Sequence, residues 1–316
     1  MTTPPPVLDT AVPVTPRASG WTRSAAAGLL ALAILAAVLA PLLAPADPAL
    51  LTLDQLQPPS AAHLLGTDAL GRDVLSRLLF ALRTDLLLMV FAAGLPMLAG
   101  TLIGAVAGYR GGFLDAALRW VADIFQALPV YVLLIAFVFV LGPGTASLLV
   151  AFSVLGWVVY ARLIRTEVRR VRERDYVSAS YLLGLSHTAV LFRHVLPNAL
   201  RQSLVYLATD MGMALQGIAV LSFFGLGVKA GTPELGAMVS EAQLFLRSHW
   251  WLAAFPGLTI VILGSSIAAL GDRLGDRPGR LGGLGGFGGR LGDRPGRLGR
   301  PDGLGSRLGG REEARQ

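Results

Sequence analysis

The chain of 316 residues contains no cysteine and a single lysine, Lys229. The absence of cysteine excludes disulfides, thiol catalysis and thiolate metal sites. A phosphate-binding P-loop needs a lysine directly followed by serine or threonine, whereas Lys229 stands between Val228 and Ala230. The chain therefore cannot bind ATP through that motif, and an ATP-driven role would need a separate nucleotide-binding subunit.

Signatures of an enzyme are missing as well. The four histidines are scattered along the chain, and no pair of them has the helical spacing of metal ligands. The sequence contains no Gly-x-Ser-x-Gly nucleophile elbow and no grouping typical of a Ser-His-Asp triad. We therefore predict no catalytic residues, no metal site and no cofactor bound by this chain itself.

Charge is scarce, since only 15% of the residues are charged while 53% are hydrophobic and the mean hydropathy is +0.61. A soluble domain would carry about a quarter charged residues, so the composition indicates an all-α protein that crosses the membrane several times. The net charge of +7 comes almost wholly from arginine. Nucleic-acid binding is not favoured, because no basic helix is interleaved with exposed aromatic residues.

Long apolar runs predict six membrane-spanning helices. A helix needs about 20 apolar residues to cross the hydrocarbon layer, and Gly142-Pro143-Gly144 divides a run that is too long for one span. We place the spans at residues 24–46, 86–109, 117–141, 145–163, 200–226 and 251–270. A cleavable signal peptide is the alternative for the first run, although its length favours a retained helix.

The distribution of arginine predicts the orientation. Residues 162–197 and the tail after the sixth span are rich in arginine, whereas the connection 225–250 is not. Because positively charged loops stay in the cytoplasm, we place both termini and the 162–197 loop inside the cell. The chain is then a multi-pass protein of the cytoplasmic membrane.

The arginine-rich loop has its own helical pattern. Residues 166–176 are compatible with an extension of the fourth span, and residues 178–183 form a short helix with small side chains on one side. Gly184 stops that helix, because glycine adopts positive φ without a Cβ penalty. Ser186 can cap a second helix at 189–195, which ends before Pro197. The pattern predicts a helix–turn–helix suited to a groove in another protein.

This spacing resembles the cytoplasmic coupling loop of permease subunits of ABC importers. Ser178, Ala179 and Ser180 stand at the positions of a Glu-Ala-Ala triplet, followed by Gly184 and by Leu196-Pro197. In that family the segment seats in a cleft of the ATPase subunit and transmits its movement. The residues expected to couple to the ATPase are Asp175, Tyr176, Ser178, Ala179, Ser180, Gly184, Leu185, Leu196 and Pro197. Ser178 departs from the family, which commonly has glutamate there, so no salt bridge is expected from it.

Further motifs resemble the second-permease (C-type) subunits of dipeptide, oligopeptide and nickel importers. They occur in order at residues 63–77, 107–112, 192–198, 221–227 and 255–258. The resemblance implies a type I ABC importer permease fold and a second, similar permease subunit in a heterodimer. It also implies two ATP-binding subunits, which would bind the ATP, and an extracytoplasmic solute-binding protein.

The cargo implied by the resemblance is peptide, with nickel or a metal chelate as the main rival. A secondary transporter or channel is the alternative from another class, and would favour broken helices and ionisable residues at the midplane. A membrane-embedded enzyme is the third, and would need polar groups clustered at one depth.

A few polar and small residues within or beside the spans invite structural or functional interpretations. Residues 66–77 read as a turn and an interfacial amphipathic helix, whose charges form an internal ion network or receive a binding protein. Gly100, Gly104 and Gly108 predict close approach of another helix. Asp123 is expected to pair with Arg119. Asp210 borders a translocation cavity or makes a structural hydrogen bond, since a membrane-buried carboxylate should face protein or water.

These interpretations divide the chain into four parts. We expect a disordered N-terminus at 1–20, a first transmembrane helix with an extracytoplasmic connection at 21–80, and the transport domain at 81–272. The coupling loop occupies 164–197 within that domain, with the docking segment at 175–197. The Gly- and Arg-rich residues 273–316, in which LGDRPGRL occurs twice, have too little apolar surface to fold and are expected to be disordered.

Overall fold

The computed structural model describes residues 20–275, and side chains within 24–271. The predictions of disorder for 1–20 and 273–316 therefore lie outside the described residues, apart from the helical positions at their inner ends. The described part is helical with one isolated β-bridge, Thr67–Asp73. Its helices are α1 (Gly20–Val38), α2 (Ala40–Leu43), α3 (Val74–Arg110), α4 (Gly112–Ala127), α5 (Val130–Leu141), α6 (Thr145–Arg172), α7 (Asp175–Leu182), α8 (His187–Val190), a π turn (Leu191–Val195), α9 (Leu196–Phe223), α10 (Leu235–Ala242), a 3-10 turn (Gln243–Phe245) and α11 (Trp251–Gly275).

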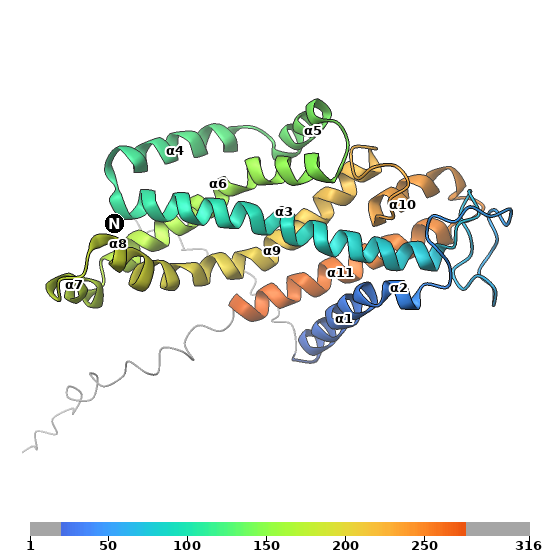
Figure 1. The fold of residues 1–316 in the computed structure, drawn as a ribbon, viewed down its shortest axis with the longest axis horizontal. Helices are drawn as coiled ribbons and strands as arrows, with labels where there is room; N and C mark the ends of the chain where they lie inside the picture. The colour runs from blue at the N-terminus through green and yellow to red at the C-terminus, as the bar shows by residue number, and fades with distance from the viewer. Residues whose placement is uncertain (1–19, 276–316) are drawn as a thin grey trace, which may run out of the picture. The chain divides into compact units, whose positions relative to one another are not determined.

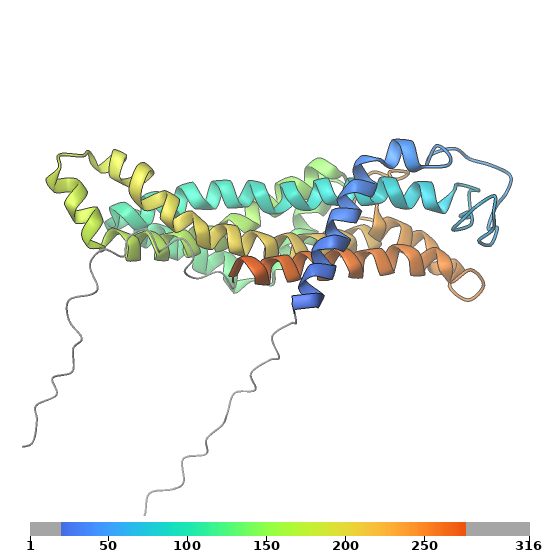
Figure 2. The same cartoon turned by 90° about the horizontal axis from the view of Figure 1, so that it is seen from below.

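Long helices α3, α6, α9 and α11 lie side by side, with α7 and α8 at one end and α10 with the 44–73 connection at the other (Figure 1). Helix α1 crosses them obliquely (Figure 2). Four helices of the described part are long and apolar enough to span a membrane, or five when α4 and α5 count as one bent span. The first predicted span, 24–46, corresponds to the shorter apolar helix Ser24–Val38.

Proline explains two differences from the predicted spans. The run 24–46 is interrupted at Leu39, because Pro41 in the first turn of α2 cannot continue the helix before it. The prediction of one helix over 117–141 is wrong: the segment forms two helices, α4 and α5, which meet at an angle of 88°. Pro129 lies at this break in an extended conformation and caps α5, and its restriction of Leu128 ends α4 there.

The predicted interfacial helix around residues 66–77 is also not a separate element. Asp73 caps a helix that starts at Val74 and continues without a break to Arg110, so the second span begins well before residue 86. The Asp73 side chain accepts a hydrogen bond from the Ser76 backbone N–H at 2.8 Å. The charged residues of this stretch pair inside the protein, as buried Arg77 does with Asp68.

The predicted glycine stripe brings α3 and α6 into backbone contact. A Cβ at Gly100, Gly104 or Gly108 would lie 2.3, 2.3 and 2.7 Å from the carbonyl oxygens of Trp157, Ala161 and Arg165. The partner number rises with the glycine number, so the two helices run parallel. The stripe therefore serves helix packing, as the small residues of membrane helices commonly do.

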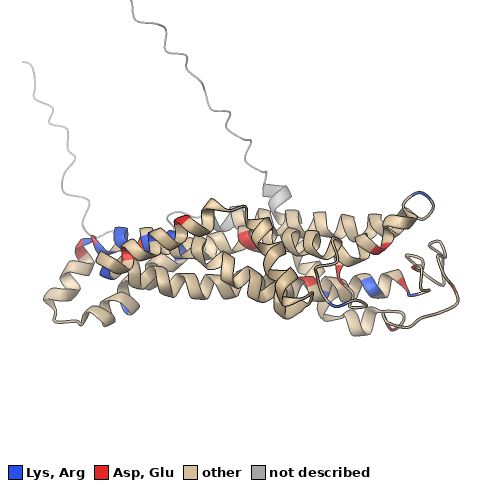
Figure 3. Cartoon of the chain, turned by 90° about the horizontal axis from the view of Figure 1, so that it is seen from above, with Lys and Arg blue, Asp and Glu red and all other residues tan. Residues whose placement is uncertain are grey.

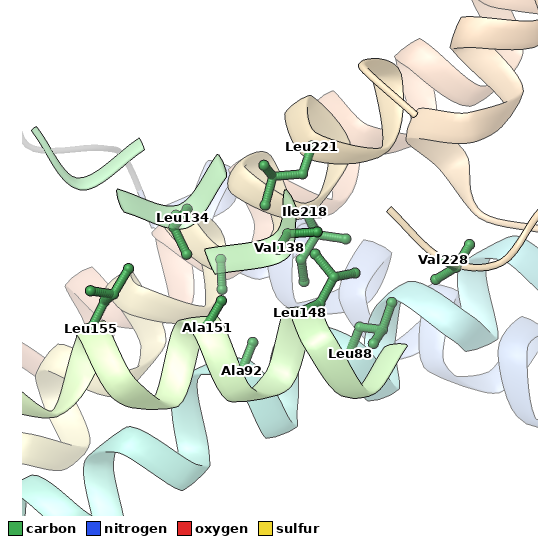
Figure 4. Packing of buried hydrophobic residues seen from close by; sticks show 11 residues of the cluster. Leu88, Ala92, Leu134, Val138, Leu148, Ala151, Leu155, Ile218, Leu221 and Val228 are labelled. Carbon is green, nitrogen blue, oxygen red and sulfur yellow. The ribbon is translucent and has the colours of Figure 1, made fainter. Parts of the chain in front are cut away.

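The main apolar core lies between α3, α5, α6 and α9. Figure 4 shows Leu134 and Val138 of α5 directed toward Leu148 and Ala151 of α6, with Ile218 of α9 beside them. These side chains are at most 3% exposed. Helix α5 is thus held by apolar packing on α6 although α4 and α5 are bent apart.

Candidate functional site

The predicted helix–turn–helix is present at the arginine-rich end of the bundle. Helix α7 ends in a Schellman motif, in which Leu185 N–H donates to Ser180 O at 3.3 Å and Gly184 N–H to Tyr181 O at 2.9 Å. Gly184 has φ +82°, and no atom lies within 4 Å of the place where a Cβ would stand. The backbone angle, not crowding, therefore requires glycine here, as predicted.

The second half of the segment begins as expected and ends differently. Ser186 accepts a hydrogen bond from Ala189 N–H at 3.3 Å and so caps α8. The helix does not end before Pro197. It widens into the π turn, in which Leu196 N–H donates to Leu191 O, and continues as α9. A π turn relieves the conflict that the proline ring has with a preceding carbonyl, so α8 and α9 form one continuous body.

Apolar packing ties this segment to the long helices. Val177 of α7 and Val190 of α8 are fully buried against Ile164 and Val168 of α6. Ala105 and Tyr109 of α3 belong to the same cluster. A displacement of α7 would therefore be transmitted to α3, α6 and α9 through van der Waals contact.

The outer surface of the segment is apolar and unpartnered in the described part of the chain. Leu182 is 89% and Leu183 82% exposed, and Tyr176 is 40% exposed. Of the residues predicted to couple, Asp175, Tyr176, Ser178, Ala179, Gly184, Leu185 and Pro197 are exposed, whereas Ser180 and Leu196 are buried. Two leucines at the tip of a charged loop are costly to leave in water, so this surface fits a partner protein.

A cluster missed by the sequence reasoning fixes the base of the segment. Asp115 of α4 is 5% exposed and pairs with Arg165 of α6 through both carboxylate oxygens, one of the bonds measuring 2.8 Å. Arg119 and Arg169 approach the same carboxylate at 3.5 and 3.7 Å. Asp115 and Arg119 are four residues apart in the sequence, and so are Arg165 and Arg169. This helical spacing was the signal that could have indicated the cluster. The arginines gather toward the α7 end in Figure 3.

The predicted pairing of Asp123 with Arg119 is wrong. Asp123 pairs with Arg162 of α6 at 2.6 Å, while Arg119 turns toward Asp115 one turn earlier in α4. A partner on the neighbouring helix competes successfully for Asp123, and this contact further ties α4 to α6.

Asp210 of α9 is held by a hydroxyl group from α6. Tyr160 is fully buried and donates its hydroxyl to Asp210 Oδ2 at 2.8 Å. The Tyr206 ring lies edge-on to Tyr160, with 5.1 Å between the ring centroids. Asp210 itself is half-buried. The structural hydrogen bond considered for Asp210 is therefore present, and it satisfies one carboxylate oxygen.

The α10 end holds the predicted internal ion network. Arg77, only 2% exposed, donates to Asp68 at 2.6 Å and to Glu241 of α10 at 2.6 Å. Arg72 donates to the same two carboxylates at 2.7 and 2.9 Å. The network fastens the 44–73 connection and α3 to α10, and a cavity of about 560 Å³ lies beside it.

Two fully buried carboxylates were also missed. Asp85 of α3 accepts from Leu235 N–H at 2.9 Å, and Glu234 accepts from Gly236 and Ala237 N–H at 3.0 and 2.7 Å. Together they satisfy the first three backbone donors of α10. Within residues 24–271, no group of three or more His, Asp or Glu side chains is placed to hold a metal ion.

Comparisons with known proteins agree with this arrangement. A family model described as binding-protein-dependent transport system inner membrane component matches residues 100–279. The dipeptide transport system permease protein DppC of Alkalihalophilus pseudofirmus is 35% identical over 248 residues, which cover 77% of this chain and 80% of the relative. The nickel transport system permease protein NikC of Escherichia coli is 37% identical over 260 residues, covering 82% of this chain and 94% of the relative.

A solved structure shares the fold. A chain from the inward-facing MetNI methionine ABC transporter aligns with a TM-score of 0.50 and covers 63% of this chain and 94% of that chain. The sequence identity is 20%, so this likeness concerns the fold alone.

Proposed function

We propose, from the premise that this chain belongs to the family of binding-protein-dependent transport system inner membrane components, that it is a peptide-importing permease driven by separate ATPase subunits. The chain is an ABC importer permease of the peptide and nickel family, with the type I permease fold. Dipeptides and oligopeptides are the proposed cargo, and nickel or a metal chelate is the second candidate because a nickel permease is among the similar proteins.

The observation that carries the coupling mechanism is the exposed tip of α7 on a buried base. Leu182 and Leu183 offer apolar area to a partner, while Val177 and Val190 connect the same element to α3, α6 and α9. Residues 175–197 would seat in a cleft of the ATPase subunit. Closure of the ATPases upon ATP binding would then move the long helices. This movement would change the side of the membrane to which the translocation cavity between the two permeases opens.

The remaining components follow from this assignment. A second permease would pair with this chain so that the pore forms between them, two ATPase subunits would bind the ATP, and a solute-binding protein would deliver cargo outside. The chain would have no ATPase site of its own, since Lys229 stands in no P-loop. The arginine distribution supports an α7 end and both termini in the cytoplasm.

We propose that Asp210 lies on the translocation path and responds to the movement of the coupling segment. Its half-buried carboxylate links α9 to Tyr160 of α6, two helices that the segment 175–197 would move. The carboxylate oxygen that Tyr160 does not engage would face the cavity. Asp210→Asn should reduce transport more than it reduces the amount of protein in the membrane.

The experiment is ATP-dependent uptake of a labelled dipeptide by proteoliposomes containing the whole complex. Gly184→Val forces a β-branched residue to φ +82° and should abolish uptake, with loss of the ATPase subunits during purification. Gly184→Asn is the matched control, because asparagine tolerates this conformation, and it should retain both. Full uptake by Gly184→Val would contradict the coupling role. Uptake by this chain without ATPase subunits would instead favour a secondary transporter.

A further inference from the structure

A second cavity lies behind the helix–turn–helix, at the foot of α3. It has a volume of about 560 Å³ and is bounded by the ends of α3 and α6 and by α7 and α8. We call it the Arg110 pocket. The residues that define it for this argument are Tyr109, Arg110, Arg172, Tyr181, His187 and Phe192.

The lining of the Arg110 pocket is positively charged. It contains two guanidinium groups and no acidic side chain. Arg172 is held in place by donating to the Tyr109 carbonyl at 2.6 Å, and its guanidinium lies 5.8 Å from the centre of the Tyr109 ring. Arg110 forms no side-chain hydrogen bond or ion pair with any residue whose side chain the structure describes. An anion is therefore the ligand that this charge favours.

Further hydrogen-bonding groups complete the wall. The hydroxyl groups of Tyr109 and Tyr181 contact each other, and the His187 ring lies 6.4 and 5.0 Å from the centres of the two tyrosine rings. Thr188 adds a hydroxyl group. Guanidinium, phenol, imidazole and hydroxyl groups converging on one cavity are suited to the oxygen atoms of a phosphate.

The depth of the pocket indicates where such a phosphate would come from. Arg110 is the first charged residue after the charge-free run 86–109 of α3. Gly108 abuts the backbone of Arg165, which is one turn beyond Arg162, the first charged residue of α6. One turn is about 5 Å along a helix, and the headgroup layer is about 5–7 Å thick on each side. The pocket therefore lies at the level of lipid headgroups.

The pocket also has an apolar wall on the membrane side of Arg110. Val106, one turn earlier in α3, lines the pocket there. Phe192 of the π turn lines it as well and is 50% exposed. A soluble phosphate would gain nothing from Val106, whereas the glycerol and first acyl carbons of a phospholipid would cover it. Basic pockets at the cytoplasmic ends of membrane helices are suited to anionic headgroups.

We infer that the Arg110 pocket binds the phosphate headgroup of an anionic phospholipid from the leaflet at the α7 end, which is the cytoplasmic leaflet in the proposed orientation. The phosphate lies between Arg110 and Arg172, and the headgroup contacts Tyr181 and His187. The lipid thereby braces the helix–turn–helix against α3, so that the membrane itself supports the element that couples to the ATPase.

The test is the retention of phosphatidylglycerol by the purified whole complex in phosphatidylcholine nanodiscs, measured by native mass spectrometry. Arg110→Gln and Arg172→Gln should each weaken retention about fivefold, as expected for one arginine near an anionic surface. Arg110→Lys should retain most of the binding. The control is Arg174→Gln, an exposed arginine of the same loop outside the pocket, which should change little.

Three results would overturn the inference. Equal retention by Arg110→Gln and the unchanged protein would show that the pocket does not hold the lipid. An equal loss in Arg174→Gln would show attraction by loop charge alone. Displacement of the lipid by millimolar inorganic phosphate would show a site for a soluble anion instead. Retention can be measured without transport, so it is independent of whether peptide is the cargo.

Discussion

The two ends of the bundle hold their charges in opposite ways. At the α10 end, Arg77 is 2% exposed and its guanidinium is shared between Asp68 and Glu241. At the α7 end, Arg172 and Arg174 are exposed, and Leu182 at the end of α7 is 89% exposed. The α10 end therefore shares its arginines among carboxylates of the same chain, whereas the α7 tip carries exposed arginines and leucines above the buried Asp115–Arg165 pair.

The two arrangements predict different effects of substitution. Breaking a buried, shared ion network leaves unpaired charges and costs stability directly. Exposed groups contribute little to folding, so substituting them tests contacts with other molecules and not stability. We therefore expect substitutions at the α10 end to act on stability, and substitutions at the α7 tip to act on coupling.

The largest effect on stability should come from Arg77→Ala. Removing this guanidinium leaves Arg72 alone between Asp68 and Glu241, so part of their negative charge is no longer compensated, which should cost about 3 kcal/mol. Thermal unfolding of the purified complex and the amount of protein in the membrane measure it. Arg83→Ala, at an exposed position two turns further along α3, is the control and should change little. A stable Arg77→Ala variant would mean that the network is dispensable.

An intermediate effect is expected from Asp115→Asn, at the base of the α7 end. The substitution removes the charge that holds Arg165, which should cost about 1.5–3 kcal/mol, the range for hydrogen bonds to charged groups. Because Arg165 belongs to the helix that leads into α7, ATP hydrolysis should also become less dependent on cargo. Loss of stability as large as in Arg77→Ala would remove the contrast between the two ends.

The smallest effect on stability and the most selective effect on function should come from Leu182→Ser. The side chain is exposed and touches little of this chain, so the change in stability should stay within about 0.5 kcal/mol. Co-purification of the ATPase subunits and dipeptide uptake should both fall. Leu53→Ser, at a position 98% exposed at the other end, is the matched control and should leave the co-purification of the ATPase subunits unchanged.

The sequence predicted local structure best at positions where the backbone geometry admits only one or a few residue types. Gly184, Ser186 and the Gly100–Gly104–Gly108 stripe predicted a turn, a cap and a close helix contact that the structure contains. It was least informative about partners distant in the chain. The pairing of Asp115 with Arg165 joins residues 50 positions apart, and helical spacing alone shows only which charges share a face.

Proline misled the span boundaries in two opposite ways. Pro129 lies at a break in a segment whose apolar composition predicted one continuous helix. Pro197 was expected to end a helix, but that helix continues through a π turn. In both cases the neighbouring backbone decides the outcome, because a lost hydrogen bond can be relieved either by a break or by a wider turn. Composition does not distinguish between these outcomes.

The most direct measurement uses the absence of cysteine, which makes any introduced thiol unique in this chain. A thiol-attached photocrosslinker is placed at Leu182→Cys or, as control, at Leu53→Cys in the assembled complex. We predict that Leu182→Cys crosslinks to an ATPase subunit, that nucleotide changes the yield, and that Leu53→Cys does not crosslink to it. Crosslinking from Leu53→Cys alone, or from neither position, would contradict the claim that α7 meets the ATPase.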